Sequence, residues 1–175
     1  RRQVQVVRCI LVWFFIGEEP GEWTLIGPCG NEADVTTNSA TGATSSTMTL
    51  NGTVNSSGLS LSDRGFIYGT NSTNVANSEL GALVGDSKAI SAGGTAISSF
   101  SQSISGLCPG QTYYYKAYAT NSDGTGYGSN ITKSLTSPGT YVSVQDGPWT
   151  SAATWGGCSP PSTTTGNTIY VSHNV

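Results

Sequence analysis

Charged residues are scarce in this sequence. Only 10% of its 175 residues are Asp, Glu, Lys or Arg, against about a quarter in an ordinary soluble domain. The Lys- and Glu-covered surface of a helical cytosolic protein is therefore excluded, and Ser, Thr, Asn and Gly must supply the polar surface. Those residues favour turns and strands over helices. With a net charge of −3, the chain also lacks the basic surface that binds nucleic acid.

Motifs that carry chemistry are missing as well. The single histidine, His173, cannot form a two-histidine metal site within one chain, and no HExxH, Walker, GxSxG or CxxC motif occurs. Three glutamates near residue 20 are more typical of a solvated loop than of a glycosidase pair. Four aspartates stand beside turn residues, which favours turns over weak calcium binding: Asp63, Asp86, Asp123 and Asp146. We predict a protein that is not an enzyme and needs no cofactor or metal.

The cysteines are few but even in number. Four cysteines are compatible with two disulfides in an oxidising, extracellular compartment, and they lie too far apart in sequence for a zinc knuckle. Three pairings are open. We predict that Cys9 pairs with Cys29 and closes an N-terminal hairpin, and that Cys108 pairs with Cys158 and fastens a corner loop to the C-terminal tail.

No apolar run reaches the roughly 20 residues that span a bilayer. The run at residues 10–16 follows two arginines, as in a signal sequence, but an initiating Met and a small-residue cleavage site are missing nearby. Gln and Val alternate over residues 3–6, so we predict an extended strand that becomes apolar on both faces. Such a strand must be covered by its own sandwich or by a neighbouring subunit.

The most informative segment is residues 106–121. Pro109 and Gly110 form a corner, and a long aromatic strand follows. Every second residue from Tyr113 to Ala119 shares one face, and those from Tyr114 to Tyr118 share the other, which is the period of a half-buried strand. A tyrosine just past such a corner can return its hydroxyl to the upstream backbone, as in immunoglobulin-type sandwiches.

Further strands with the same period surround this one. They are expected near residues 35–37, 47–54, 66–68, 97–104 and 127–135, with turn-rich stretches between them. Their number and spacing are typical of an immunoglobulin-like or fibronectin type III-like module. We predict an all-β sandwich at residues 33–137, with an N-terminal strand and hairpin or linker at 1–32 and a C-terminal β extension at 138–175.

Three stretches resemble the fibronectin type III-like repeats of secreted and cell-surface proteins of Bacteroidota. They are Met48-Thr49-Leu50-Asn51-Gly52-Thr53-Val54, Asp63-Arg64-Gly65-Phe66-Ile67-Tyr68-Gly69-Thr70 and the segment from Ile104 to Gly128. The resemblance implies an extracellular module that spaces or links other parts of a surface protein. Asn51-Gly52 departs from the animal pattern, which usually places a buried Trp there.

Residues 140–175 resemble the opening of the β-solenoid modules that follow such repeats. The similarity lies in Trp149, in Ala153-Thr154-Trp155-Gly156-Gly157 and in the alternating stretch from Ile169 to Val175. A solenoid cannot bury its face with one rung. The tail is therefore expected to pack on its own sandwich, to pair with another chain, or to belong to a longer parent.

Two classes of function remain. We favour a secreted or cell-surface structural or adhesive protein, a subunit of a fibre or assembly joined through its terminal strands to other copies or to neighbouring modules. Its expected assembly residues are Ile10, Val12, Phe14, Ile16, Ile169, Val171 and Val175. The alternative is a carbohydrate-binding accessory module, in which two exposed, coplanar rings stack on sugars. Its candidate rings are Tyr114, Tyr118, Trp149 and Trp155.

Overall fold

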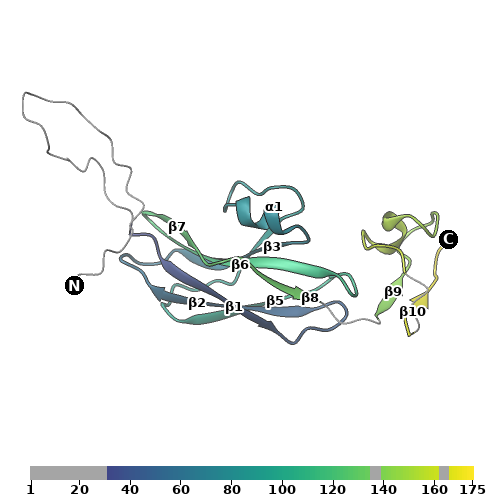
Figure 1. The fold of residues 1–175 in the computed structure, drawn as a ribbon, viewed down its shortest axis with the longest axis horizontal. Helices are drawn as coiled ribbons and strands as arrows, with labels where there is room; N and C mark the ends of the chain where they lie inside the picture. The colour runs from purple at the N-terminus through teal and green to yellow at the C-terminus, as the bar shows by residue number, and fades with distance from the viewer. Residues whose placement is uncertain (1–30, 135–138, 162–165) are drawn as a thin grey trace, which may run out of the picture.

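A computed structural model describes residues 31–134, 139–161 and 166–175 (Figure 1). Strands dominate these residues, with one short α-helix and one 3-10 turn. The elements are β1 (Asp34–Thr41), β2 (Met48–Ser56), β3 (Asp63–Gly69), α1 (Ser72–Asn77), β4 (Lys88–Ser91), β5 (Ser99–Ile104), β6 (Thr112–Asn121), β7 (Gly124–Tyr127), β8 (Ile131–Ser134), β9 (Thr140–Val142), η1 (Ala152–Trp155) and β10 (Thr168–Tyr170).

Two antiparallel sheets form the all-β sandwich that the sequence predicts. One sheet has the order β1-β2-β5, and the other has the order β4-β3-β6-β7, with β8 also paired to β6. The sheets face each other with β5 over β3, where the rings of Phe66 and Phe100 are 5.1 Å apart. At the opposite side β1 approaches β7 closely, because Gly126 has no Cβ to collide with the carbonyl of Ala33.

The core lies between the sheets and follows the predicted alternation. Met48, Leu50 and Val54 of β2 face inward, as do Phe100 and Ile104 of β5. Strand β6 is buried on both faces because α1 covers its outer side (Figure 1). One face of β6 lines the core with four residues: Tyr113, Tyr115, Ala117 and Ala119.

Gly52 lies near the centre of β2, where the facing side chains leave no room for a larger residue. A Cβ at this position would lie 2.8 Å from Cζ of Phe100 and 3.0 Å from the Cβ of Ala117. The space over Gly52 is therefore filled by Phe100 from the neighbouring strand β5 and by Ala117 from β6. Phe100 also lies beneath the guanidinium of Arg64, 5.0 Å from its ring centroid.

The elements that were not anticipated from the sequence include α1 and β4. The stretch from Gly69 to Ser72 looks like a turn, but Asn71 caps α1, and its side chain accepts a hydrogen bond from the backbone N–H of Asn74. The helix places Val75 against Ile67 and Tyr118 in a second small core. Strand β4 was also missed, since its four residues are too short to show a period.

The C-terminal unit, residues 139–161 and 166–175, lies at one end of the sandwich (Figure 1). Strands β9 and β10 pair in parallel, with Thr140 opposite Thr168 and Val142 opposite Tyr170. The turn η1 belongs to the connection between these two strands. This parallel pair differs from the sandwich, whose ladders are all antiparallel.

Candidate functional site

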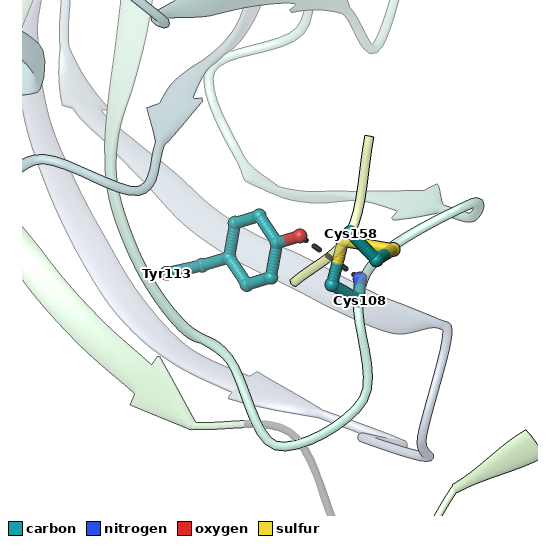
Figure 2. Close-up of a disulfide and its surroundings, with 3 residues drawn as sticks. All are labelled: Cys108, Tyr113 and Cys158. Carbon is teal, nitrogen blue, oxygen red and sulfur yellow. Dashed lines mark hydrogen bonds between the residues drawn. A yellow bond between two sulfur atoms is a disulfide. The ribbon is translucent and has the colours of Figure 1, made fainter. Parts of the chain in front are cut away.

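A disulfide joins the C-terminal unit to the sandwich. Cys108 in the corner between β5 and β6 bonds to Cys158, which follows η1 (Figure 2), so this predicted pairing is confirmed. Gly139 contributes a second contact, since a Cβ there would collide with the side chain of Pro109. The corner is itself fixed, because the backbone N–H of Cys108 donates to the hydroxyl of Tyr113 at 3.0 Å (Figure 2).

This contact is the predicted return of a tyrosine hydroxyl to the upstream backbone. A second tyrosine of β6 acts in the same way across the sandwich. The hydroxyl of Tyr115 accepts from the N–H of Ala40 at 2.6 Å and donates to the carbonyl of Asn38 at 3.2 Å. The other predicted disulfide, between Cys9 and Cys29, lies outside the described residues and stays a prediction.

The parallel ladder of the C-terminal unit continues past its strands. The N–H of Ser143 donates to the carbonyl of Tyr170 at 3.0 Å, and the N–H of Gly147 donates to the carbonyl of Asn174 at 2.9 Å. Asp146 accepts from the N–H of Asn174 through its carboxylate at 2.9 Å. The segment after β10 therefore follows the segment after β9 up to the end of the described chain.

Ser143 and His173 hold these two segments together. Ser143 is buried, and its Oγ accepts from the N–H groups of Ser172 at 3.0 Å and His173 at 3.2 Å. Nδ1 of His173 lies 2.9 Å from the carbonyl oxygen of Ser143, so the tautomer with a proton on Nδ1 donates to it. Oγ of Ser143 also lies 3.1 Å from Nδ1 of His173, so this buried hydroxyl is a structural clamp between the two segments. Sequence analysis missed Ser143 because one serine in a Ser-rich chain carries no signal.

The four candidate sugar-binding rings are not brought together as a platform. Tyr118 and Trp155 are buried, at 1% and 3% exposure, and Tyr114 is half-buried. Trp149 is 40% exposed, but it meets Trp155 edge-on, with their ring planes 72° apart. Trp155 also donates its indole N–H to the carbonyl of Trp149 at 2.7 Å. Among the four candidates, Trp149 is thus the one exposed ring, and it packs against the buried Trp155.

The expected assembly residues of the C-terminus lie at the surface. Val171 and Val175 are exposed, and Ile169 is half-buried on β10. The N-terminal members of the set, from Ile10 to Ile16, lie outside the described residues. The structure adds exposed apolar residues that the sequence analysis did not single out: Val142, Val144 and Tyr170. Tyr170 lies within the alternating stretch from Ile169 to Val175 but between the residues singled out there, and Val144 lies outside the strands β9 and β10.

The aspartates beside turns hold those turns together. Asp86 accepts hydrogen bonds from the N–H and hydroxyl of Thr70 and, at 2.9 Å, from the amide of Asn74. These bonds stabilise the charged carboxylate, and the one from the Thr70 hydroxyl contributes most in lowering the pKa of Asp86 to about 2. Asp63 accepts from the hydroxyl of Tyr118 at 2.9 Å. Within the described residues, no three His, Cys, Asp or Glu side chains gather as a metal site.

Two buried titratable groups lie on the outer face of β6. Burial raises the pKa of Tyr118, and its hydrogen bond to Asp63 adds to the increase. Burial lowers the pKa of Lys116, whose Nζ donates to the carbonyl of Ala76 at 3.0 Å and lies over the ring of Tyr127. Lys116 thereby attaches α1 to the sheet by a hydrogen bond, and Tyr118 does so by packing against Val75 of α1.

None of the helices described here is both long and apolar enough to cross a membrane. No family model matches the chain, and no curated protein matches it. Among solved structures, the chain is similar to a short form of the sensor domain of the anti-sigma factor RsgI4 from Pseudobacteroides cellulosolvens, with 19% identity and a TM-score of 0.42 over 59% of this chain and 94% of that one.

A longer form of the same sensor domain aligns with 20% identity and a TM-score of 0.39, over 59% of this chain and 89% of the other. The solution structure of the domain aligns with 19% identity and a TM-score of 0.42, over 59% of this chain and 75% of that one. Similarity this distant carries no argument about function, so the functional proposal must come from the molecule itself.

Proposed function

We propose that this protein is an extracellular structural or adhesive subunit that assembles through its terminal strands. The observation that carries the proposal is the gathering of exposed apolar side chains on the small C-terminal unit. Six of its large apolar residues are exposed: Val142, Val144, Trp149, Tyr170, Val171 and Val175. Exposed apolar side chains that form one patch mark a site that contacts another macromolecule, and we propose that those of the C-terminal unit do so.

The backbone of the C-terminal unit supports the same proposal. Parallel strands are almost always buried within larger sheets, and a two-stranded sheet is marginally stable alone. Among the described residues, β9 and β10 pair only with each other. Both outer edges of the pair therefore offer N–H and C=O groups to a further strand. A neighbouring copy or module that adds a strand would satisfy these groups and cover Val142 and Tyr170.

The disulfide fits this role and the proposed compartment. It fixes the C-terminal unit to the corner at Cys108, so a contact made by β10 is transmitted to the sandwich. Disulfides persist in oxidising compartments, which supports a secreted or cell-surface location. The resemblance to the repeats of Bacteroidota surface proteins agrees with such a location.

The experiment compares assembly of the full chain with that of two apolar-to-acid variants. Val171→Asp should abolish the high-mass species seen by light scattering and the particles seen by electron microscopy, while the circular dichroism of the sandwich stays unchanged. Leu83→Asp is the matched control, because Leu83 is exposed to a similar degree but lies between α1 and β4. A wild-type chain that stays monomeric at every concentration would contradict the proposal.

Carbohydrate binding remains the second candidate because of the ring of Trp149. An exposed indole held edge-on by Trp155 is a fixed surface for one sugar ring. If this candidate is right, Trp149→Ala abolishes retention on an insoluble polysaccharide without changing the mass of the assembly. The structural proposal predicts that Trp149→Ala changes assembly and that the wild-type chain is not retained.

A further inference from the structure

Strand β10 turns part of its backbone away from β9. The N–H of Thr168 donates to the carbonyl of Gly139 at 3.1 Å, and the carbonyl of Tyr170 accepts from the N–H of Ser143 at 3.0 Å. In a parallel ladder, every second residue of a strand bonds to the same neighbour. The residue between them, Ile169, therefore points its N–H and C=O groups outward, away from β9.

Val171 continues this outer edge. The N–H of the next residue, Ser172, turns back to Oγ of Ser143, so Val171 faces the opposite way. Neither Ile169 nor Val171 has a hydrogen-bond partner on the outer side within the part of the chain that the structure describes. Strand β10 also lies farther from the sandwich than β9 does (Figure 1). The outer edge of β10 is thus open over residues 169–171.

The outer edge of β9 is closed sooner. By the same alternation, Thr140 and Val142 point their backbone groups away from β10. The N–H of Val144, however, donates to the carbonyl of Thr154 at 2.9 Å. Thr154 belongs to η1, so the connection between the two strands occupies the edge beside Val144. Of the two edges, that of β10 is the more open to a further strand.

The β10 edge carries no charge that would repel a second copy. Residues 166–175 contain no Asp, Glu, Lys or Arg, and Asp146 is the single charged residue of 139–161. Its carboxylate is bonded to the N–H of Asn174 at 2.9 Å. Natural strand edges are usually protected by charged side chains or proline. Residues 168–171 have neither, so two copies of this edge can approach each other.

Tyr170 supplies an apolar contact at the centre of this edge. It lies between the two outward residues, and its side chain is 59% exposed. Val142 is opposite Tyr170 on β9 and is 48% exposed, so both side chains share the outer face of the pair. A second β10, turned by a two-fold rotation, would place Tyr170 of the partner subunit beside this one. The two rings and the two copies of Val142 would then form one stripe across four strands, and aromatic pairs across strands are stabilising.

We infer that β10 pairs in antiparallel fashion with β10 of a second copy, around a two-fold axis between the two copies of Tyr170. The inference rests on the proposed function and specifies its partner, edge and symmetry. Ile169 is then opposite Val171 of the partner subunit, and each such pair exchanges two main-chain hydrogen bonds. The contact is isologous, as in most dimers of identical chains. Because the edge is short, we expect a reversible pair whose population rises with concentration.

Disulfide trapping of the full chain tests the symmetry. Tyr170→Cys places two thiols across the axis, where the Cα atoms of a non-bonded antiparallel pair are about 4.5 Å apart, within the range of a disulfide. Mild oxidation should give a covalent dimer linked through position 170, identified by non-reducing electrophoresis and peptide mapping. Thr168→Cys is the matched control, since it is exposed on the same face of β10 but would be opposite Ser172 of the partner subunit. It should form a covalent dimer about tenfold more slowly.

A mixture of two variant chains tests the competing arrangement. If β10 instead paired in parallel with β9 of the next copy, Tyr170 would be opposite Val142 of that copy. Chains with Tyr170→Cys mixed with chains with Val142→Cys would then be linked to each other, and neither variant would be linked alone. This result would overturn the two-fold pairing.

A second pair of variants tests the main-chain contact. Val171→Pro removes one outward N–H from each copy and should raise the dissociation constant of the pair by about tenfold or more. Proline is tolerated at an edge whose N–H faces solvent, so hydrogen exchange of the β9–β10 ladder should not change. Val171→Ala keeps the N–H and should weaken the pair less. Equal weakening by the two variants would overturn the inference.

Two further outcomes separate this inference from the proposed function. Assembly that persists in Val171→Pro, with no covalent dimer from Tyr170→Cys, would overturn the β10 contact and leave assembly through other surfaces in place. A wild-type chain that stays monomeric at every concentration, with no covalent dimer from Tyr170→Cys, would overturn both.

Discussion

The sandwich and the C-terminal unit are stabilised in different ways. The sandwich buries a continuous core between two sheets, with Leu50, Phe66 and Tyr115 fully inaccessible. The C-terminal unit buries one large ring, Trp155, and relies on the Cys108–Cys158 disulfide and on hydrogen bonds to Ser143 and Asp146. The comparison teaches that burial of apolar side chains stabilises the sandwich. The C-terminal unit instead depends on one disulfide and a few hydrogen bonds, and it leaves apolar side chains exposed.

The largest expected effect tests the interior of the sandwich. Phe66→Ala removes a fully buried ring that contacts Phe100, and it should lower the free energy of unfolding by about 3–5 kcal/mol. Denaturation in urea followed by tyrosine and tryptophan fluorescence measures the change. A loss below about 1 kcal/mol would show that the core is not packed as described.

The next effect tests the link between the two regions. Replacing Cys108 and Cys158 together by serine should cost about 2–4 kcal/mol, because the disulfide closes a long loop in the unfolded chain. We expect residues 139–175 to become sensitive to protease while the sandwich stays resistant. If both regions were cleaved together, the disulfide would be stabilising the sandwich itself. Free thiols in the unreduced wild-type protein would contradict the pairing directly.

A smaller effect tests the clamp within the C-terminal unit. Ser143→Ala leaves the N–H groups of Ser172 and His173 without their acceptor, which should cost about 1–3 kcal/mol. The change should accelerate hydrogen exchange in residues 168–175 only. His173→Ala should have a milder effect because it removes a side chain and leaves both N–H groups bonded to Ser143. The reverse order would indicate that the imidazole does more than support the clamp.

The substitution with the smallest expected effect removes the charge of Asp86, in the loop between α1 and β4. The pKa of Asp86 falls from 3.8 to about 2 in the folded protein, so its ionised form stabilises the fold above pH 4. That contribution is lost as the pH falls through about 2. Asp86→Asn should cost less than about 1 kcal/mol at pH 7, since the group is exposed to solvent. The variant should also lose less stability than the wild type between pH 4 and 2, as measured by thermal unfolding.

Local pattern was sufficient for most of the sandwich. The alternation in β2, β5 and β6 predicted which side chains enter the core, and the corner at Pro109 predicted the hydroxyl contact of Tyr113. The helix α1 was missed, because its six residues are Ser, Thr, Asn, Val and Ala and carry no helical period. Its cap at Asn71 looks the same as a turn in sequence.

The candidate site was less predictable. Val171 and Val175 were singled out from alternation alone, but nothing in the sequence shows that Val142 and Tyr170 are opposite each other in a parallel pair. The candidate sugar-binding rings illustrate the same difficulty. Tyr118 and Trp149 are equally aromatic in the sequence, yet one is buried beneath α1 and the other is exposed.

Three cysteine pairings were open from the sequence, and the structure decided that Cys108 bonds to Cys158. The sequence by itself determined the all-β class and the core-facing side chains of β2, β5 and β6. It could do so because side-chain alternation and turn chemistry are local properties. Only the tertiary structure decided that both faces of β6 are buried, that β9 and β10 pair in parallel, and which aromatic rings reach solvent. These features depend on which distant segments meet, and residues such as Tyr115 and Ser143 acquire their role only from segments that are far from them in sequence.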